Sequence, residues 1–187
     1  KRVFFFSLET VNANEFMFSA PGEDEFGELL YYLKNNPGSL PSKLNGYRKR
    51  HPAWGFDYIQ PFSRIKDWES LTGEDTLCLL QAANGSCDYT VVDLPCAYDE
   101  RVWNVLEHSA QIWWLVTDNR QCLAKTCSII EALQELYAAE TNILWEKCRF
   151  ILNKYTGSLA NDFHRKGIGI DGFLPYIPEW KAMSRNE

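Results

Sequence analysis

The residue whose type and position most clearly suggest a chemical role is an aspartate that directly follows an apolar run. Residues 89–92 read Tyr-Thr-Val-Val and are followed by Asp93, Leu94 and Pro95. β-Branched and aromatic residues favour a strand, so Asp93 is expected at a strand end. Magnesium prefers oxygen ligands and keeps several waters, so one well-placed carboxylate can hold its water shell. Alternatively, Asp93 caps the helix that follows, and the residues alone leave both interpretations open.

Other residues that could bind a ligand or act in catalysis show weaker sequence signals. Residues 167–172 spell Gly-x-Gly-x-x-Gly, but a dinucleotide-binding motif follows a strand and opens a helix, whereas this one follows a predicted helix and opens a strand. The basic run at residues 48–50 is short and is interpreted as a solvated loop. The 3 histidines lie far apart in the sequence, and the 6 cysteines form no Cys-x-x-Cys pair, so we expect neither a catalytic histidine nor a zinc site.

Composition indicates a globular chain of one domain. It has 187 residues, of which 45% are hydrophobic and 24% are charged. The net charge of −6 disfavours sequence-independent binding to nucleic acids, and no specific nucleic acid is expected as a partner. No apolar run approaches the length of a membrane-spanning helix, so we expect no transmembrane segment.

The elements that must position Asp93 alternate between strands and helices. Short apolar runs predict strands at residues 2–8, 56–61, 89–92, 112–117, 149–153 and 170–174. Helical spacing of apolar residues predicts helices at residues 25–34, 74–83, 99–108, 121–140 and 158–166. We also expect a turn at residues 19–22 and an irregular exposed loop at residues 41–54.

This alternation predicts an α/β fold with a mostly parallel sheet and helices on both faces, because the strands are continuous apolar runs. In such sheets, ligands bind outside the carboxyl ends of the strands. The polar residues expected at those ends are Ser7, Glu9, Asp93, Thr117, Asp118, Asn153, Lys154, Pro175 and Tyr176.

Five segments, taken in order, resemble those of one enzyme family. They are residues 1–9, 93–95, 112–117, 151–155 and 172–176. Together they resemble the MinD/ParA family of deviant Walker-A P-loop ATPases, and within it the CpaE/TadZ type associated with pilus assembly. The resemblance implies a P-loop NTPase-like fold that is incomplete at its N-terminus.

The resemblance also implies roles for individual residues. Asp93 matches the Walker B aspartate, which holds the magnesium shell. Ser7 and Glu9 match the two acidic positions after the family's second strand, and Glu9 would lie near the metal or the attacking water. Asn153 matches the asparagine that contacts adenine, and Pro175 matches a proline near the base.

One signature of the family does not occur. Its phosphate-binding loop reads Lys-Gly-Gly-x-Gly-Lys-Thr, and this chain contains no Gly-Lys pair. Because residue 1 is Lys and the only methionines are Met17 and Met183, we expect a single domain over residues 1–187 that is the C-terminal part of an ATPase domain from a longer protein. This chain alone is therefore not expected to hydrolyse ATP.

For the whole protein, the resemblance implies ATP and Mg²⁺ as cofactors, and a homodimer that positions a pilus or secretion machine. Its location would be cytoplasmic, with association to a cell pole or membrane through partners. Two alternatives remain. One is a degenerate, non-enzymatic localisation module of the same fold. The other is a receiver-like signalling domain, which would require a second strand-end acid and a lysine that the sequence does not show.

Overall fold

The computed structural model describes residues 1–10, 25–62, 64–136 and 138–179. The chain divides into two units, Lys1–His108 and Ser109–Glu187, and each unit carries its own sheet. The sequence predicted one sheet, whereas the described strands form a four-stranded sheet and a three-stranded sheet. The turn expected at residues 19–22 lies outside the described residues.

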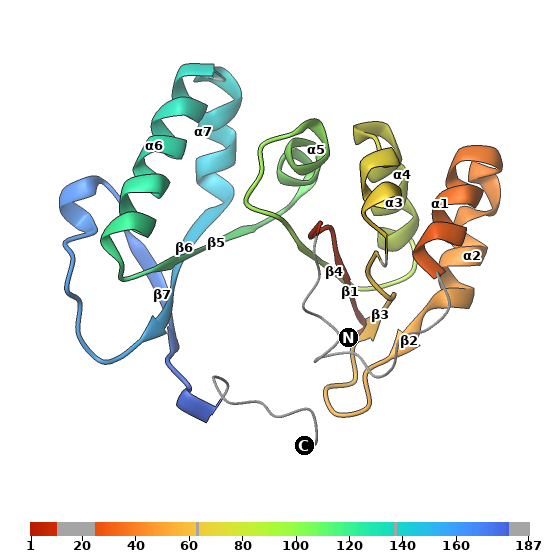
Figure 1. The fold of residues 1–187 in the computed structure, drawn as a ribbon, viewed down its shortest axis with the longest axis horizontal. Helices are drawn as coiled ribbons and strands as arrows, with labels where there is room; N and C mark the ends of the chain where they lie inside the picture. The colour runs from red at the N-terminus through yellow and green to blue at the C-terminus, as the bar shows by residue number, and fades with distance from the viewer. Residues whose placement is uncertain (11–24, 63, 137, 180–187) are drawn as a thin grey trace. The chain divides into compact units, whose positions relative to one another are not determined.

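The central strand of the first unit is β1, the aromatic run that opens the chain. The strands of its sheet are β1 (Val3–Ser7), β2 (Lys49–Arg50), β3 (Asp57–Tyr58) and β4 (Tyr89–Asp93), in the order β2-β3-β1-β4 (Figure 1). β1 is parallel to β3 and β4, while β2 is antiparallel to β3. The register places Ser7 opposite Asp93, so the carboxyl ends of β1 and β4 meet at one edge.

The described helices of the first unit lie on one face of this sheet (Figure 1). They are α1 (Glu25–Asn35), the short 3₁₀ helix η2 (Pro37–Ser39), α2 (Leu40–Tyr47), α3 (Ile65–Ser70), α4 (Gly73–Asn84) and α5 (Glu100–His108). Alternate residues of β1 point to this face, because side chains alternate along a strand. The buried core there includes Phe4, Phe6, Leu29, Leu44, Leu79 and Val105.

The second unit is a three-stranded parallel sheet. Its elements are β5 (Ile112–Thr117), α6 (Arg120–Leu136), α7 (Ala138–Lys147), β6 (Cys148–Tyr155), the 3₁₀ helix η3 (His164–Lys166) and β7 (Ile170–Pro175). The strand order is β5-β6-β7, and the core contains Val116, Leu123, Leu152, Phe163 and Ile168. The predicted α/β class with mostly parallel strands is therefore confirmed.

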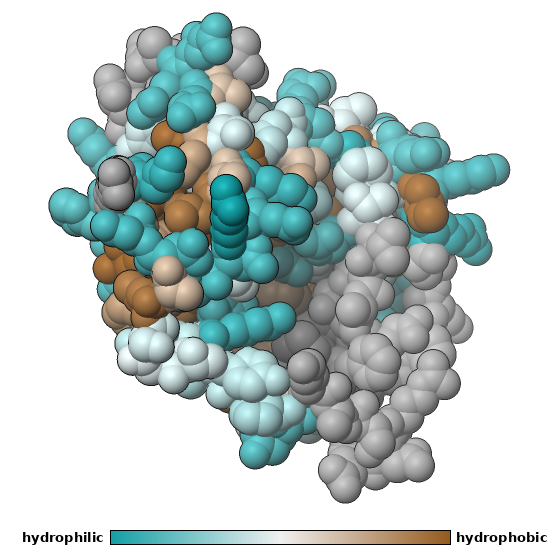
Figure 2. All heavy atoms as spheres, turned by 60° about the vertical axis from the view of Figure 1, so that its left-hand side comes forward, coloured by the Kyte–Doolittle hydropathy of each residue, from teal (hydrophilic) through white to brown (hydrophobic). Residues whose placement is uncertain are grey.

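Helices were expected on both faces of the sheet, but in the second unit the described helices cover one face. The Trp114 ring packs against the rings of Trp145 and Phe150, each 5.8 Å away between centroids. Trp113 and Leu115, on the opposite face of β5, are 66% and 54% exposed. Figure 2, which brings this unit forward, shows apolar residues interrupting a mainly hydrophilic surface. A continuous apolar run predicts a buried strand but does not specify what covers its second face.

Two local predictions were wrong. Residues 41–54 were expected to form an irregular loop, yet they include most of α2 and all of β2. Proline is tolerated in the first turn of a helix, and Pro41 occupies that turn of α2. Residues 158–166 were expected to be helical, but only His164–Lys166 form a 3₁₀ turn.

Candidate functional site

Asp93 is the last residue of β4 and is held in place by the end of β1. The Ser7 hydroxyl donates a hydrogen bond of 3.0 Å to Asp93 Oδ2. The backbone N–H of Leu8 donates to the Asp93 carbonyl at 2.8 Å. Ser7 is buried and Asp93 is half-buried, so both the backbone and the carboxylate of Asp93 have defined positions.

The alternative role of Asp93 as a helix cap is wrong. The next helix, α5, begins at Glu100, and its cap is Asp99. Asp99 Oδ1 accepts hydrogen bonds from the backbone N–H groups of Arg101 and Val102, at 3.0 and 3.1 Å. Because Asp99 serves as the cap, the Asp93 carboxylate is not needed there and stays at the strand end.

Glu9 lies close enough to Asp93 for their charges to interact. Burial of the side chain and the negative charge of Asp93 together raise the pKa of the Glu9 carboxyl above its usual value. The Glu9 backbone N–H donates to Ser7 Oγ at 3.2 Å, which ties the turn after β1 to the same hydroxyl. The structure therefore brings Ser7, Glu9 and Asp93 together.

The chemistry of this cluster suits a hard divalent cation. Its side chains offer two carboxylates and a hydroxyl, and oxygen ligands are those that Mg²⁺ and Mn²⁺ prefer. Within the described ranges, no group of three His, Cys, Asp or Glu side chains could hold a metal. The cluster therefore fits a cation that keeps much of its water shell, rather than one enclosed by protein ligands.

Glu9→Gln should stabilise the chain at neutral pH. A raised pKa in the folded state means that the folded protein favours the protonated form of the Glu9 carboxyl. The stability that protonated Glu9 contributes is therefore complete below its pKa in the unfolded chain, and it is lost as the pH rises through its pKa in the folded chain. We expect the variant to gain about 0.5 kcal/mol near pH 7, because a neutral amide removes the cost of partly burying a charge and the repulsion from Asp93. Urea unfolding of both chains measures this gain, which should disappear near pH 4. A gain of equal size at both pH values would contradict the assigned cause.

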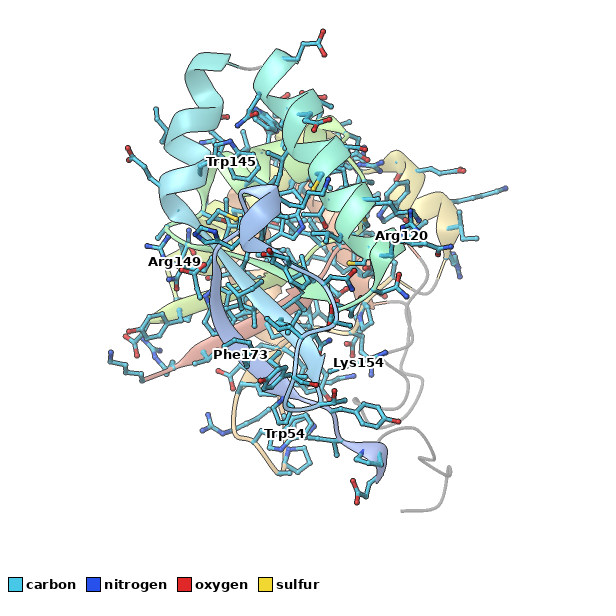
Figure 3. All side chains as sticks on the ribbon, turned by 90° about the vertical axis from the view of Figure 1, so that its left-hand side faces the viewer. Trp54, Arg120, Trp145, Arg149, Lys154 and Phe173 are labelled. Carbon is cyan, nitrogen blue, oxygen red and sulfur yellow. The ribbon has the colours of Figure 1, made fainter. Side chains whose placement is uncertain are left out.

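Asn153 and Pro175, the residues matched to adenine contact, lie in the second unit. Asn153 is opposite Thr117 in the register, and its Oδ1 accepts a 2.8 Å hydrogen bond from the Lys154 backbone N–H. Pro175 is opposite Tyr155, near the carboxyl end of β6. Figure 3 shows Lys154 and Phe173 near these strand ends. Both predicted residues therefore occupy carboxyl ends of parallel strands, as expected.

Asp118 is an anchor whose structural role the sequence did not reveal. It follows β5, and its carboxylate accepts hydrogen bonds from the Ala160 N–H at 2.5 Å and from the Asn161 side-chain amide at 2.7 Å. Burial favours a higher pKa for Asp118, but these hydrogen bonds outweigh it and lower the pKa. The loop after β6 is thereby fixed beside the end of β5. The bonded residues are about 40 positions apart in the chain, so no local pattern could indicate this contact.

Comparison with known proteins gives structural matches only. No protein family profile and no curated protein matches the sequence. The structure superimposes on a ParA family ATPase from Chlorobium tepidum TLS with a TM-score of 0.75 and 17% identity, covering 95% of this chain and 71% of that one. The fold is that of the MinD/ParA ATPases.

Two further structures of MinD/ParA type agree with this fold. The septum site-determining protein MinD from Pyrococcus horikoshii OT3, complexed with Mg-ADP, matches with a TM-score of 0.65 and 12% identity over 95% of this chain and 70% of that one. The MinC:MinD complex of Aquifex aeolicus matches with a TM-score of 0.52 and 14% identity over 96% and 71%. Identities this low establish a shared fold, and the chemistry must be argued from this chain's own residues.

Proposed function

We propose that this chain is the magnesium- and adenine-binding part of a MinD/ParA-like ATPase domain. The observation that carries the proposal is the gathering of Ser7, Glu9 and Asp93 at the carboxyl ends of adjacent parallel strands. This is the position where α/β sheets bind ligands. The MinD structure of the same fold is complexed with Mg-ADP, which supports a magnesium nucleotide as the ligand class.

Each site residue has a proposed role. Asp93 would hold the water shell of Mg²⁺, with its orientation set by the Ser7 hydroxyl. Glu9 would lie beside the cation or the attacking water. Asn153 and Pro175 would contact adenine from the ends of β6 and β7. A bound cation would neutralise part of the negative charge of the phosphates.

For the whole protein we propose the CpaE/TadZ type of function: a homodimeric ATPase that positions a pilus or secretion assembly. The MinC:MinD complex supports the idea that this fold can work with a protein partner. Among the described helices, none is both long and apolar enough to cross a membrane. From the resemblance to the CpaE/TadZ type, we propose a cytoplasmic location, with any association to a pole or membrane made through partners.

The test is a calorimetric titration of this chain with Mg-ATP. The 187 residues contain no Gly-Lys pair, and the Gly-Lys loop supplies most of the phosphate contacts in such ATPases. We expect binding weaker than about 100 μM, because adenine and cation contacts remain while the phosphate cradle is absent. A dissociation constant in the low micromolar range would overturn the proposal and require a phosphate site of another kind.

A second candidate is a degenerate localisation module of the same fold that works through protein contacts. Ser7 favours it, because a hydroxyl stands at a position matched to an acid and its hydrogen bond engages Asp93 Oδ2. A degenerate site would bind no divalent cation through Asp93. Replacing Asp93 and measuring the affinity for a divalent cation therefore distinguishes the two candidates.

A further inference from the structure

A tryptophan far from the site in sequence contacts the turn that carries Glu9. Trp68 lies on α3, and its indole Nε1–H donates a 2.9 Å hydrogen bond to the Leu8 carbonyl, 60 residues away in the chain. Leu8 is 2% exposed, and its own N–H donates to the Asp93 carbonyl. The residue between Ser7 and Glu9 is thus fixed on one side by β4 and on the other by Trp68.

An arginine holds the tryptophan in turn. The Arg101 guanidinium stacks on the Trp68 ring, 3.5 Å from its centroid. Arg101 Nη1 also donates to the Trp68 carbonyl at 2.7 Å, at the C-terminal end of α3. A cation is favourable at a helix C-terminus, and α3 has only 6 residues with which to stabilise itself.

Arg101 is itself anchored by the segment that follows β4. Its guanidinium pairs with the Asp99 carboxylate, with Nε at 3.1 Å from Oδ2, and Asp99 also caps α5. Leu8, Trp68, Arg101 and Asp99 therefore form a continuous series of contacts. This series joins the turn after β1, which carries Glu9, to the segment that follows Asp93 at the end of β4.

We propose that Trp68 and Arg101 are positioning residues that fix the Leu8 backbone and thereby hold Glu9 beside Asp93. Two like charges repel, so the turn after β1 needs an external restraint to keep both carboxylates at one cation. A hydrogen bond to a nearly buried carbonyl and a stacked guanidinium provide that restraint. The consequence for cation binding rests on the proposed function, whereas the restraint of the turn does not.

Trp68→Phe is the variant that tests this role, because phenylalanine keeps a ring for stacking but has no N–H donor. The matched control is Trp54→Phe, at an exposed tryptophan in the hairpin between β2 and β3 of the same unit. Loss of one hydrogen bond costs about 1 kcal/mol, which corresponds to about a fivefold change in an equilibrium constant. We expect Mn²⁺ affinity to fall about fivefold in Trp68→Phe and the Glu9 amide to exchange its hydrogen about fivefold faster. Neither quantity should change in Trp54→Phe.

A double variant separates positioning from general stability. If Trp68 acts through Glu9, then Trp68→Phe should change Mn²⁺ affinity less than about twofold when Glu9 is already Gln. An equal loss in both backgrounds, or unchanged exchange at Glu9, would overturn the positioning role. If the unaltered chain bound no Mn²⁺, the proposed function would fail, and the exchange at Glu9 would still decide whether Trp68 fixes the turn.

Discussion

A chain carrying Asp93→Asn is expected to bind Mn²⁺ at least about tenfold more weakly than the unaltered chain. Asparagine has the same shape, and its side-chain oxygen can still accept the hydrogen bond that Ser7 donates to Asp93 Oδ2. The substitution therefore removes the negative charge while keeping the junction of β1 and β4. Titration monitored by electron paramagnetic resonance of free Mn²⁺ measures the affinity of each chain.

The control for this comparison is Asp88→Asn. Asp88 precedes β4, and its carboxylate accepts a 2.6 Å hydrogen bond from the Arg2 backbone N–H, at the opposite end of the strand. This variant loses the same charge but at the other end of β4, so its Mn²⁺ affinity should change by less than about twofold. Equal losses of Mn²⁺ affinity in the two variants would mean that the affinity depends on net charge alone. That result would remove the support for a site at Asp93.

Leu152→Ala is expected to lower the free energy of unfolding by about 3 kcal/mol. Leu152 is fully buried in β6, opposite Val116 of β5, and packs in the core beneath α6. Removing its side chain leaves a cavity, because the neighbouring side chains can only partly close the space. Urea unfolding followed by circular dichroism measures the loss.

Leu115→Ala provides the matched comparison. Leu115 lies on the adjacent strand β5 but is 54% exposed, so its truncation should cost less than about 1 kcal/mol. Comparing the two variants tests whether the Leu115 face of this parallel sheet is exposed to solvent. Similar losses in the free energy of unfolding for the two leucines would show that the Leu115 face is packed in solution.

Most strands and several helices could be predicted because their signals are local. The apolar runs that form β1, β4 and β5 are bounded by polar residues, and the helix at α5 begins with a capping aspartate. α2 was missed because Pro41 in its first turn and Gly46 near its end suggested a loop. The helix predicted at residues 121–140 covers α6 and only the first residues of α7, which continues to Lys147, and its apolar spacing did not distinguish these two helices.

The candidate site could be predicted in part, for the same reason. Glu9 and Asp93 each follow an apolar run, and parallel strands share a carboxyl edge, so their proximity follows from local patterns and topology. The contacts of Trp68 with Leu8 and of Arg101 with Trp68 depend on how helices pack on the sheet. Such contacts join positions without a common pattern, and only the folded structure reveals them.

The most direct test of a cation site at the ends of β1 and β4 is a map of backbone amide signals broadened by Mn²⁺. Because paramagnetic broadening falls steeply with distance, signals from residues 7–10 and from Asp93 and Leu94 should disappear first as Mn²⁺ is added. Glu131 and Asp162, acidic residues that line a pocket of about 670 Å³ at α6, give the contrasting location. Broadening that begins there, with the amides of Glu9 and Asp93 unchanged, would contradict the proposed site.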